Sequence, residues 1–391
     1  LQRMVSGAKS FNMLAMPMFI FAGALMVYGS TPRLIKLANM LLRKFPGGLG
    51  ATAMAACGFF GAVSGSGVAS AAAIGKIIGP SMLEEGYPKG LTAGLIAAGG
   101  TMACIIPPSI VMVVYAQSAS VSVGDMFMGG WIPGIMMGLS LVIIIMIECR
   151  KKGIQASKAK SSWGQRWKSF REAFWGFLMP VIIIGGIYGG VFTPTEAAAV
   201  SVVYGLVVGV FIYREVKMKD MIDILVDSGK TTGGIMLIIG AATLFSYVCT
   251  VFGIAQAAQA LLLEISGNKY IFLLIVNVIF LIAGCFVDAN SAMYIFIPIM
   301  YPVATQLGID PVHFGVIATV NLAIGQVTPP VGVNLFVAIG VSEKLQGLRD
   351  KTKVTIVSMS KAVWPQIVAC IIALLLITYV PWFSTVLLFG K

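Results

Sequence analysis

The chain has 391 residues, of which 58% are hydrophobic and only 11% are charged, and its mean hydropathy is +0.94. Soluble globular domains contain about 45–50% apolar and about 25% charged residues, so this composition excludes that class and indicates a polytopic helical membrane protein. The net charge of +12 does not indicate a nucleic-acid partner, because the basic residues cluster in short segments between apolar runs, where they orient a chain in the bilayer.

Eight apolar runs are long enough to cross about 30 Å of hydrocarbon as helices. They lie at residues 11–28, 89–120, 127–149, 174–192, 196–213, 230–252, 311–340 and 361–388. The amphipathic stretch 32–45 is predicted to lie along the membrane surface. Segment 150–172 carries eight Lys and Arg residues against one Glu, which places it in the cytoplasm. Alternation of the spans then puts the C-terminus on the outer side.

The sequence repeats itself weakly at an offset of 222 residues. The correspondence is carried by two proline pairs, one further proline and one polar insertion: Pro107-Pro108 with Pro329-Pro330, Pro80 with Pro302, and Ser66 with Asp288. About five predicted membrane passes separate the copies, and an odd number inserts them upside down relative to each other. Inverted repeats with interrupted apolar segments at matching positions are typical of secondary transporters.

Each copy contains a polar interruption that predicts a re-entrant helical hairpin. The first is the sequence SGSG at 64–67, and the limb after it is expected to run from Val68 to about Ile78, where Pro80 closes it. Such a limb rises only about 16 Å, roughly half of the hydrocarbon thickness. The second interruption is the sequence DANS at 288–291. The earlier limbs, 47–63 and 269–287, are nearly long enough to cross, so full spans stay open as the alternative.

The proline pairs predict a break in one spanning helix of each copy. Proline lacks an N–H and clashes with the carbonyl four residues back. The carbonyls expected to be freed are those of Ala103, Cys104, Gly325 and Gln326. Carbonyls and hydroxyls are hard oxygen ligands that suit Na⁺, and the N-termini of half-helices attract carboxylates. A simple kink repaired by neighbouring helices is the alternative.

Ionisable residues inside membrane-spanning sequence are functional candidates by default. Asp288 either binds Na⁺ or caps the half-helix that follows it. Glu196, three residues after Thr193, predicts a capping box, and Asp125 predicts a helix cap. The six cysteines have no paired spacing and are expected to be small core residues. The single histidine, His313, is expected to be a polar residue at a helix end rather than a metal ligand.

Five motifs follow one another along the chain: GAVSGSGVASAAAIG (61–75), EEGYPKGLTAGLIAAGGTMACIIPPS (84–109), GDMFMGGWIPG (124–134), DANSAMYIFIPIMYPVA (288–304) and VNLAIGQVTPPVGVNLF (320–336). In this order they resemble the large membrane subunit of tripartite ATP-independent periplasmic (TRAP) transporters, and the resemblance covers essentially the whole chain. It implies an all-α fold similar to the divalent anion–sodium symporters, with scaffold helices around a transport domain of two hairpins and two broken helices.

The resemblance also implies a function and partners. The function is sodium-coupled import of an organic acid anion, such as a C4-dicarboxylate or sialic acid, by an elevator movement in a bacterial inner membrane. The partners are a small four-helix membrane subunit, fused or separate, and a periplasmic substrate-binding protein. The C-terminus is then periplasmic, and one further apolar helix is expected before Leu1. Na⁺ is the only expected coupling ion, with no transition metal and no other cofactor.

Carried over by position, the resemblance implies two sodium sites and one substrate site. The first sodium site would use Ser64, Gly65, Ser66 and Gly67 with the backbone at Gly100, Thr101 and Ala103. The second would use Asp288, Asn290 and Ser291 with Gly325, Gln326 and Thr328. The substrate would lie between the tips, against Ser66, Ser109, Asn290 and Asn334. Without a basic residue near the tips, helix N-termini, hydroxyls, amides and Na⁺ would hold the carboxylate, unless Lys76 reaches in.

The expected division of the chain follows the repeat. It consists of a scaffold helix and arm (1–46), a first transport half (47–120), scaffold helices with the basic linker (121–229), a scaffold helix and arm of the second copy (230–268), a second transport half (269–341) and a C-terminal scaffold helix (342–391).

Three other functions stay open. A stand-alone divalent-anion symporter would share the membrane core but need no partners. An intramembrane enzyme is disfavoured, because the spans hold few acidic residues and no paired carboxylates of the kind that metal-dependent chemistry needs. A passive channel would not concentrate its substrate. The chain has no GxxxxGK[ST] motif, so ATP is not expected as the direct energy source.

Overall fold

The computed structural model describes residues 2–9, 11–154, 162–344 and 354–388, and these residues form helices and connecting turns without a strand. The first copy of the repeat consists of α1 (Gln2–Ala8), η1 (Phe11–Leu14), α2 (Ala15–Gly29), α3 (Thr31–Leu42), α4 (Gly48–Ser64), α5 (Gly67–Glu84), α6 (Lys89–Ile105), α7 (Ile110–Ala119) and α8 (Val123–Lys151). Two connecting helices follow, α9 (Trp163–Tyr188) and α10 (Pro194–Leu206), the latter continued by the π-helical segment η2 (Val207–Ile212). The second copy consists of α11 (Met218–Val251), α12 (Ile254–Ser266), α13 (Lys269–Phe286), α14 (Ala289–Gln306), α15 (Pro311–Gly325), α16 (Val333–Lys344), α17 (Ile356–Tyr379) and α18 (Trp382–Thr385).

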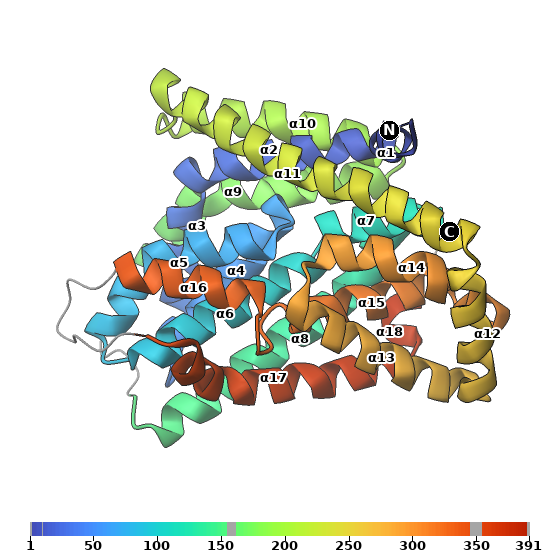
Figure 1. The fold of residues 1–391 in the computed structure, drawn as a ribbon. Coiled ribbons are helices and arrows are strands. Elements are labelled where there is room, and N and C mark those ends of the chain that lie inside the picture. Colours follow the sequence, from blue (N-terminus) through green and yellow to red (C-terminus); the bar gives the residue numbers. More distant parts are fainter. Residues whose placement is uncertain (1, 10, 155–161, 345–353, 389–391) are drawn as a thin grey trace.

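The helix boundaries confirm the repeat. At the offset of 222 residues, α5 and α14 begin and end at equivalent residues, and α4 and α13 end at equivalent residues. A break follows α6 and α15 in turn, so each copy contains a hairpin and then a broken helix. In Figure 1 the hairpins α4–α5 and α13–α14 lie toward opposite ends of the molecule with their tips at its centre, as inverted copies require.

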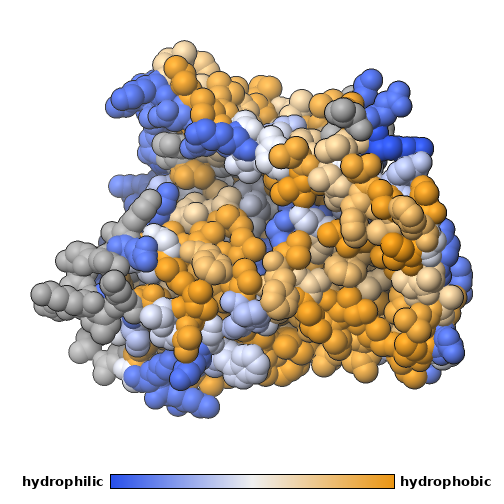
Figure 2. Space-filling model, viewed as in Figure 1, coloured by the Kyte–Doolittle hydropathy of each residue, from blue (hydrophilic) through white to orange (hydrophobic). Residues whose placement is uncertain are grey.

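The protein is a multi-pass membrane protein. Six of the described helices are long and apolar enough to span a membrane, or up to eight spans result if the bent pairs α2–α3 and α6–α7 each count as one. Figure 2 shows a broad apolar surface, with polar side chains gathered at the two ends of the molecule. The axes of α2 and α3 meet at 67°.

The helices pack as two groups (Figure 1). One group contains α2, α9, α10 and α11, and the other contains both hairpins, both broken helices, α8 and α17. The groups contact each other where α2 packs on α4 and α11 packs on α14. The arms α3 and α12 lie against the hairpins, and α3 also packs on α9. α8 and α17, which lie in the segments 121–229 and 342–391 that were expected to supply scaffold helices, pack on α6 and α15. The apolar sequence of a long helix does not specify which neighbours cover it.

The second limb of the first hairpin is longer than the sequence predicts, and the second limb of the second hairpin runs to Gln306. α5 contains 18 residues and continues through Pro80, and α14 contains 18 residues and continues through Pro298 and Pro302. Each limb rises about 27 Å, so limb length no longer argues for re-entrance. The expectation that Pro80 closes the limb is wrong. Proline leaves the carbonyl of Lys76 unpaired, but Lys76 is an exposed residue, and membrane helices tolerate proline where the surroundings compensate.

Small residues let each hairpin approach the broken helix of its own copy. A Cβ atom on Gly61 would lie 2.3 Å from Ala103 Cα, and a Cβ atom on Gly325 would lie 2.5 Å from the Gly284 backbone. Ala103 and Gly325 are equivalent in the repeat, so both copies use the same close crossing. This crossing holds the hairpin tips against the helix breaks.

We expect Gly61→Val to lower the melting temperature of the purified protein by several degrees, because overpacking costs about 1–3 kcal/mol and the obstacle here is backbone that has no rotamer to change. Gly185→Val is the matched control, since Gly185 is exposed on α9 and a Cβ atom there meets nothing within 4 Å. Equal melting temperatures for the two variants would contradict the close crossing.

Candidate functional site

The first hairpin tip is a helix end followed directly by a capped helix start. Gly65 ends α4 with a φ of +62°, in the left-handed region that glycine adopts without steric cost. Ser66 is the N-cap of α5, and its Oγ accepts a hydrogen bond from Ala69 N at 3.4 Å. Ser64 Oγ lies 3.3 Å from Ser70 Oγ. The first N–H groups of α5 therefore point toward the space in front of the tip.

Asp288 organises the second tip. Its carboxylate accepts the N–H of Asn290 at 2.9 Å, the N–H of Ser291 at 3.2 Å and the hydroxyl of Ser291. Of the two roles predicted for Asp288, the structure shows the capping role. A carboxylate has about four acceptor positions, so capping leaves part of its capacity free for another ligand.

Both helix breaks contact the hairpin tips. The N–H of Ile110, the first residue of α7, donates to the Gly65 carbonyl at 3.2 Å. At the equivalent place in the second copy, the N–H of Gly332 donates to the Cys285 carbonyl at 3.0 Å. The axes of α6 and α7 meet at 42°. The predicted breaks are thus confirmed, and each faces the tip of its own hairpin.

Three of the carbonyls expected to be free accept hydrogen bonds. Ser109 Oγ donates to the Cys104 carbonyl while accepting Met112 N–H as the N-cap of α7. The Gly325 carbonyl accepts Thr328 N–H at 2.9 Å, and the Gln326 carbonyl accepts Asn334 N–H at 3.0 Å. The expectation is wrong at these positions because the irregular segments fold back onto the helix ends. Each carbonyl retains a second lone pair.

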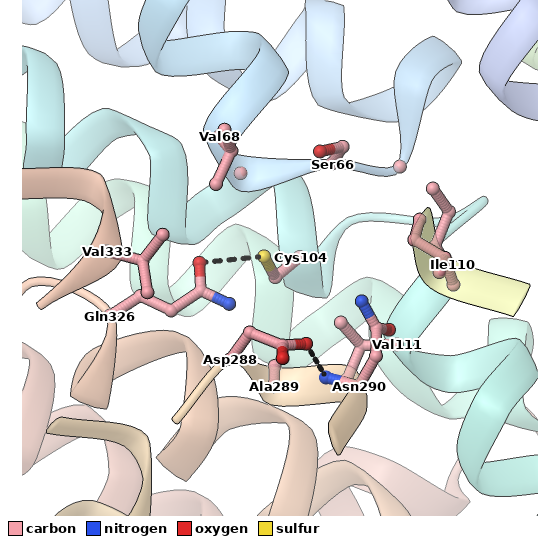
Figure 3. A pocket seen from close by; sticks show the side chains of 13 residues that line it. Ser66, Val68, Cys104, Ile110, Val111, Asp288, Ala289, Asn290, Gln326 and Val333 are labelled. Carbon is pink, nitrogen blue, oxygen red and sulfur yellow. Dashed lines mark hydrogen bonds between the residues drawn. The ribbon is translucent and has the colours of Figure 1, made fainter. Parts of the chain in front are cut away.

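The tips and breaks enclose a cavity of about 70 Å³, which we call cavity 1 (Figure 3). Its polar lining consists of Ser66 from the first tip, Asp288 and Asn290 from the second tip, and Gln326 from the second break. Cys104 Sγ lies 3.6 Å from Gln326 Oε1 across the cavity wall. Asn290 Oδ1 is buried and has no hydrogen-bond partner within the described part of the chain.

No Lys, Arg or His is among the described residues that line cavity 1, and Lys76 is exposed on α5. An anion in this cavity would meet helix N-termini, amides and hydroxyls rather than a basic side chain of the described lining.

Several predicted residues lie behind cavity 1 rather than in it. A Cβ atom on Gly100 would lie 2.7 Å from the Gly67 carbonyl oxygen and 2.7 Å from Asn334 Nδ2, so these three residues are in close contact. Asn334 is fully buried, its Nδ2 lies 3.5 Å from the Ala97 carbonyl, and its Oδ1 has no partner among the described residues. Ser109 is also buried. Ser66 and Asn290 line cavity 1, whereas Ser109 and Asn334 do not.

The other predicted sodium ligands make local contacts. The hydroxyls of Thr101 and Thr328 donate to carbonyls of the preceding turn, those of Ala98 and Ile324, at 2.7 and 2.8 Å. Ala103 and Gly325 form the close crossings described above. These residues support the positions of the breaks.

A second cavity of about 170 Å³, which we call cavity 2, adjoins cavity 1. Ser66, Ile110 and Ile235 line both. One wall of cavity 2 comes from α2 and the first hairpin, and the other comes from α11. The polar residues of the α11 wall are Asp227, Ser228 and Thr231. Sequence reasoning gives these three residues no role, although the polar stretch DSGKTTGG at 227–234, directly before the apolar second half of α11, was the signal.

The isolated predictions outside the cavities have mixed outcomes. The capping box is confirmed, since Thr193 N–H donates to Glu196 Oε2 at 2.8 Å and Glu196 N–H donates to Thr193 Oγ1 at 3.3 Å. Asp125 lies in the first turn of α8, but Ser122 is the N-cap there, so that expectation is wrong. His313 is in the first turn of α15 and its Nε2 lies 3.2 Å from the Thr378 carbonyl.

Two further predictions concern the cysteines and transition-metal binding. All six cysteines are buried and unpaired, as expected of core residues. Within the described residues, no group of three or more His, Cys, Asp or Glu side chains is placed to hold a metal ion.

Two repeat-related hairpins that meet two helix breaks at a central cavity define a secondary transporter fold. Residues 1–383 match the family model described as "Tripartite ATP-independent periplasmic transporter, DctM component". The chain belongs to this family, whose named relatives are transporter permeases and not enzymes.

Individual relatives and one solved structure agree with this assignment. The C4-dicarboxylate TRAP transporter large permease protein DctM of Rhodobacter capsulatus is 40% identical over 98% of this chain and 88% of its own. The isethionate TRAP transporter permease protein DctMQ of Oleidesulfovibrio alaskensis is 41% identical over 95% of this chain and 57% of its own. The structure of the Alcanivorax borkumensis YdaH transporter, whose topology is described as unusual, covers 100% of this chain and 87% of its own at a TM-score of 0.64 and 14% identity. That likeness shows the fold alone.

Proposed function

We propose that this protein is the large membrane permease of a sodium-coupled importer of an organic acid anion and that it works by an elevator movement. The observation that carries the proposal is cavity 1, where two hairpin tips and two helix breaks meet without a basic side chain in the described lining. The relatives named above carry the names of a dicarboxylate and of a sulfonate, isethionate, at nearly the same identity. Identity therefore supports an organic anion as the class and does not select the compound.

Helix ends explain how such a cavity holds an anion and cations together. The N-termini of α5 and α14 face it, and each carries about half a positive charge that favours a carboxylate. The C-terminal ends of α4, α6, α13 and α15 bring carbonyl oxygens to the same region. We assign one Na⁺ site to the 64–67 tip with the Gly100 backbone and Asn334 Oδ1, which has no partner among the described residues. We assign another to Asp288 and Asn290 with Gln326.

The two packing groups support the elevator movement. Cavity 1 lies almost entirely within the group formed by the hairpins, the broken helices, α8 and α17, and only Ile235 of α11 reaches it from the other group. Movement of the first group against α2, α9, α10 and α11 would carry cavity 1 across the membrane with its wall nearly intact. The arms α3 and α12 would connect the two groups during that movement.

The partners and orientation are part of the same proposal. A tripartite family description and a relative named DctMQ support a small membrane subunit and a periplasmic binding protein as partners. A stand-alone symporter would not need either component. We place the basic linker 150–172 in the cytoplasm and the C-terminus in the periplasm of a bacterial inner membrane.

The test is uptake of labelled succinate, isethionate, sialic acid and gluconate into proteoliposomes that contain the permease, its small subunit and the binding protein. With an inward Na⁺ gradient we expect concentrative uptake of at least one acid. With choline in place of Na⁺ we expect only background uptake, because the cation sites are then empty. Equal uptake in Na⁺ and choline would remove sodium from the proposal, and equilibration without concentration would indicate a passive channel.

A further inference from the structure

Cavity 2 extends the space of cavity 1 toward the N-terminal half of α11. Since Ser66, Ile110 and Ile235 line both cavities, a ligand held in cavity 1 lies next to cavity 2. Asp227, Ser228 and Thr231 all line cavity 2. Thr231 follows Asp227 by four residues and Ser228 by three, and residues three and four positions apart are neighbours on one face of a helix. This face looks across cavity 2 toward Ser64 and Ser66 of the first hairpin.

Within the described residues, the hydroxyl groups on this face do not use all of their hydrogen-bonding capacity. Ser228 is 7% exposed, and its buried Oγ has no hydrogen-bond partner within the described residues. A buried hydroxyl without a partner is unfavourable unless a ligand or water completes it. Thr231 Oγ1 donates to the Asp227 carbonyl at 2.9 Å, which leaves its lone pairs available to accept.

The α11 wall carries a negative charge. The nearest basic partner of Asp227 is Lys230, with Nζ 3.6 Å from Oδ1, and both side chains are mostly exposed, at 74% for Lys230 and 78% for Asp227. Of this pair only Asp227 lines cavity 2, so a ligand there meets the carboxylate and not the ammonium. No Lys, Arg or His is among the described residues that line cavity 2. The wall is therefore suited to hydroxyl or N–H groups of a ligand and unsuited to a second carboxylate.

We propose that cavity 2 receives the neutral, hydroxyl-bearing end of a substrate whose single carboxylate is held in cavity 1. Asp227, Ser228 and Thr231 then select hydroxylated monocarboxylates over dicarboxylates. This inference rests on the proposed function and names its substrate class. It also assigns a recognition role to α11, which belongs to the packing group that does not carry cavity 1.

The test measures binding to the purified permease with its small subunit, so that the selectivity of a binding protein does not enter. Thermal unfolding in Na⁺ is titrated with gluconate, a hydroxylated monocarboxylate, and with succinate, a dicarboxylate. A ligand that binds the folded state raises the melting temperature, and the half-maximal concentration reports its affinity. We expect a half-maximal concentration at least about fivefold lower for gluconate, because succinate brings a second charge to the Asp227 wall.

Two matched pairs of variants locate the effect. Asp227→Asn should lower the half-maximal concentration of succinate about three- to fivefold, whereas Asp223→Asn, one turn earlier on α11 and outside both cavities, should leave it unchanged. Thr231→Val should weaken gluconate binding several-fold. Thr243→Val should not, because Thr243 lines neither cavity, although its hydroxyl donates to the Ile239 carbonyl in the same manner at 2.8 Å.

The outcomes separate this inference from the proposed function. Tighter binding of succinate than of gluconate, or equal effects of Asp227→Asn and Asp223→Asn, overturns the inference while sodium-dependent uptake of an acid still supports the function. If no tested acid raises the melting temperature and none enters proteoliposomes with Na⁺, both proposals are overturned.

Discussion

Replacing Asp288 with alanine is expected to reduce sodium-dependent uptake at least tenfold, because one carboxylate holds the start of α14 at the centre of the site. It accepts two backbone N–H groups and the Ser291 hydroxyl, and it lines cavity 1. Hydrogen bonds to charged groups contribute about 1.5–3 kcal/mol each, and about 1.4 kcal/mol corresponds to a factor of ten. The measurement is initial uptake into proteoliposomes as a function of Na⁺ concentration.

Two further variants separate the cap from the cation site. Asp288→Asn retains an oxygen that can cap α14 but removes the charge, so we expect a folded protein that needs a higher Na⁺ concentration for half-maximal uptake. Asp310→Ala removes an equivalent cap at α15, where Asp310 Oδ1 accepts the N–H groups of Val312 and His313 at 2.9 Å, but Asp310 does not line cavity 1. If Asp310→Ala impaired uptake as strongly as Asp288→Ala, the effect would belong to helix capping and not to the site.

The hairpin tips could be predicted because their chemistry is local. A run of serine and glycine inside apolar sequence cannot continue a membrane helix without cost, so an unwound tip at 64–67 follows from the residues themselves. Asp288 could also be predicted locally, because aspartate is among the preferred N-cap residues of a helix. The repeat then links the two tips, and the helix boundaries of α5 and α14 agree with it at both ends.

The residues that line the cavities could not be predicted in the same way, because the lining depends on contacts between distant segments. Ser109 and Asn334 are adjacent to the breaks in sequence, yet Ser109 turns back to the Cys104 carbonyl and Asn334 is buried against Gly100. The α11 residues that line cavity 2 lie more than 150 positions from Ser66 in the sequence, and only the packing of α11 beside the first hairpin brings them together. Position along one helix specifies a face but not the surface that the face meets.

Gly67→Ala is expected to abolish uptake while leaving the protein folded. A Cβ atom on Gly67 would lie 2.7 Å from the Gly100 carbonyl oxygen, 2.9 Å from Cys104 Sγ and 3.0 Å from Gln326 Oε1. The Gly100 oxygen belongs to the backbone of α6 and cannot rotate away, so the hairpin tip itself must move. That movement separates the Gly67 and Gly100 carbonyls, to which we assign a Na⁺ site, and changes the shape of cavity 1. Overpacking of this kind costs about 1–3 kcal/mol, less than the stability of a typical folded domain.

The cause of the expected loss of uptake by Gly67→Ala can be identified, because alanine favours helices more than glycine does. Gly67 is the first residue of α5, so the substitution does not weaken that helix, and reduced activity must come from the contacts of the added methyl group. Gly340→Ala on α16 is the matched control, since a Cβ atom there meets nothing within 4 Å, and we expect wild-type uptake from it. The measurements are Na⁺-dependent uptake and the melting temperature of both variants. Wild-type uptake by Gly67→Ala would mean that the contact between Gly67 and Gly100 is not needed for transport, and the Na⁺ site assigned to the first tip would be wrong.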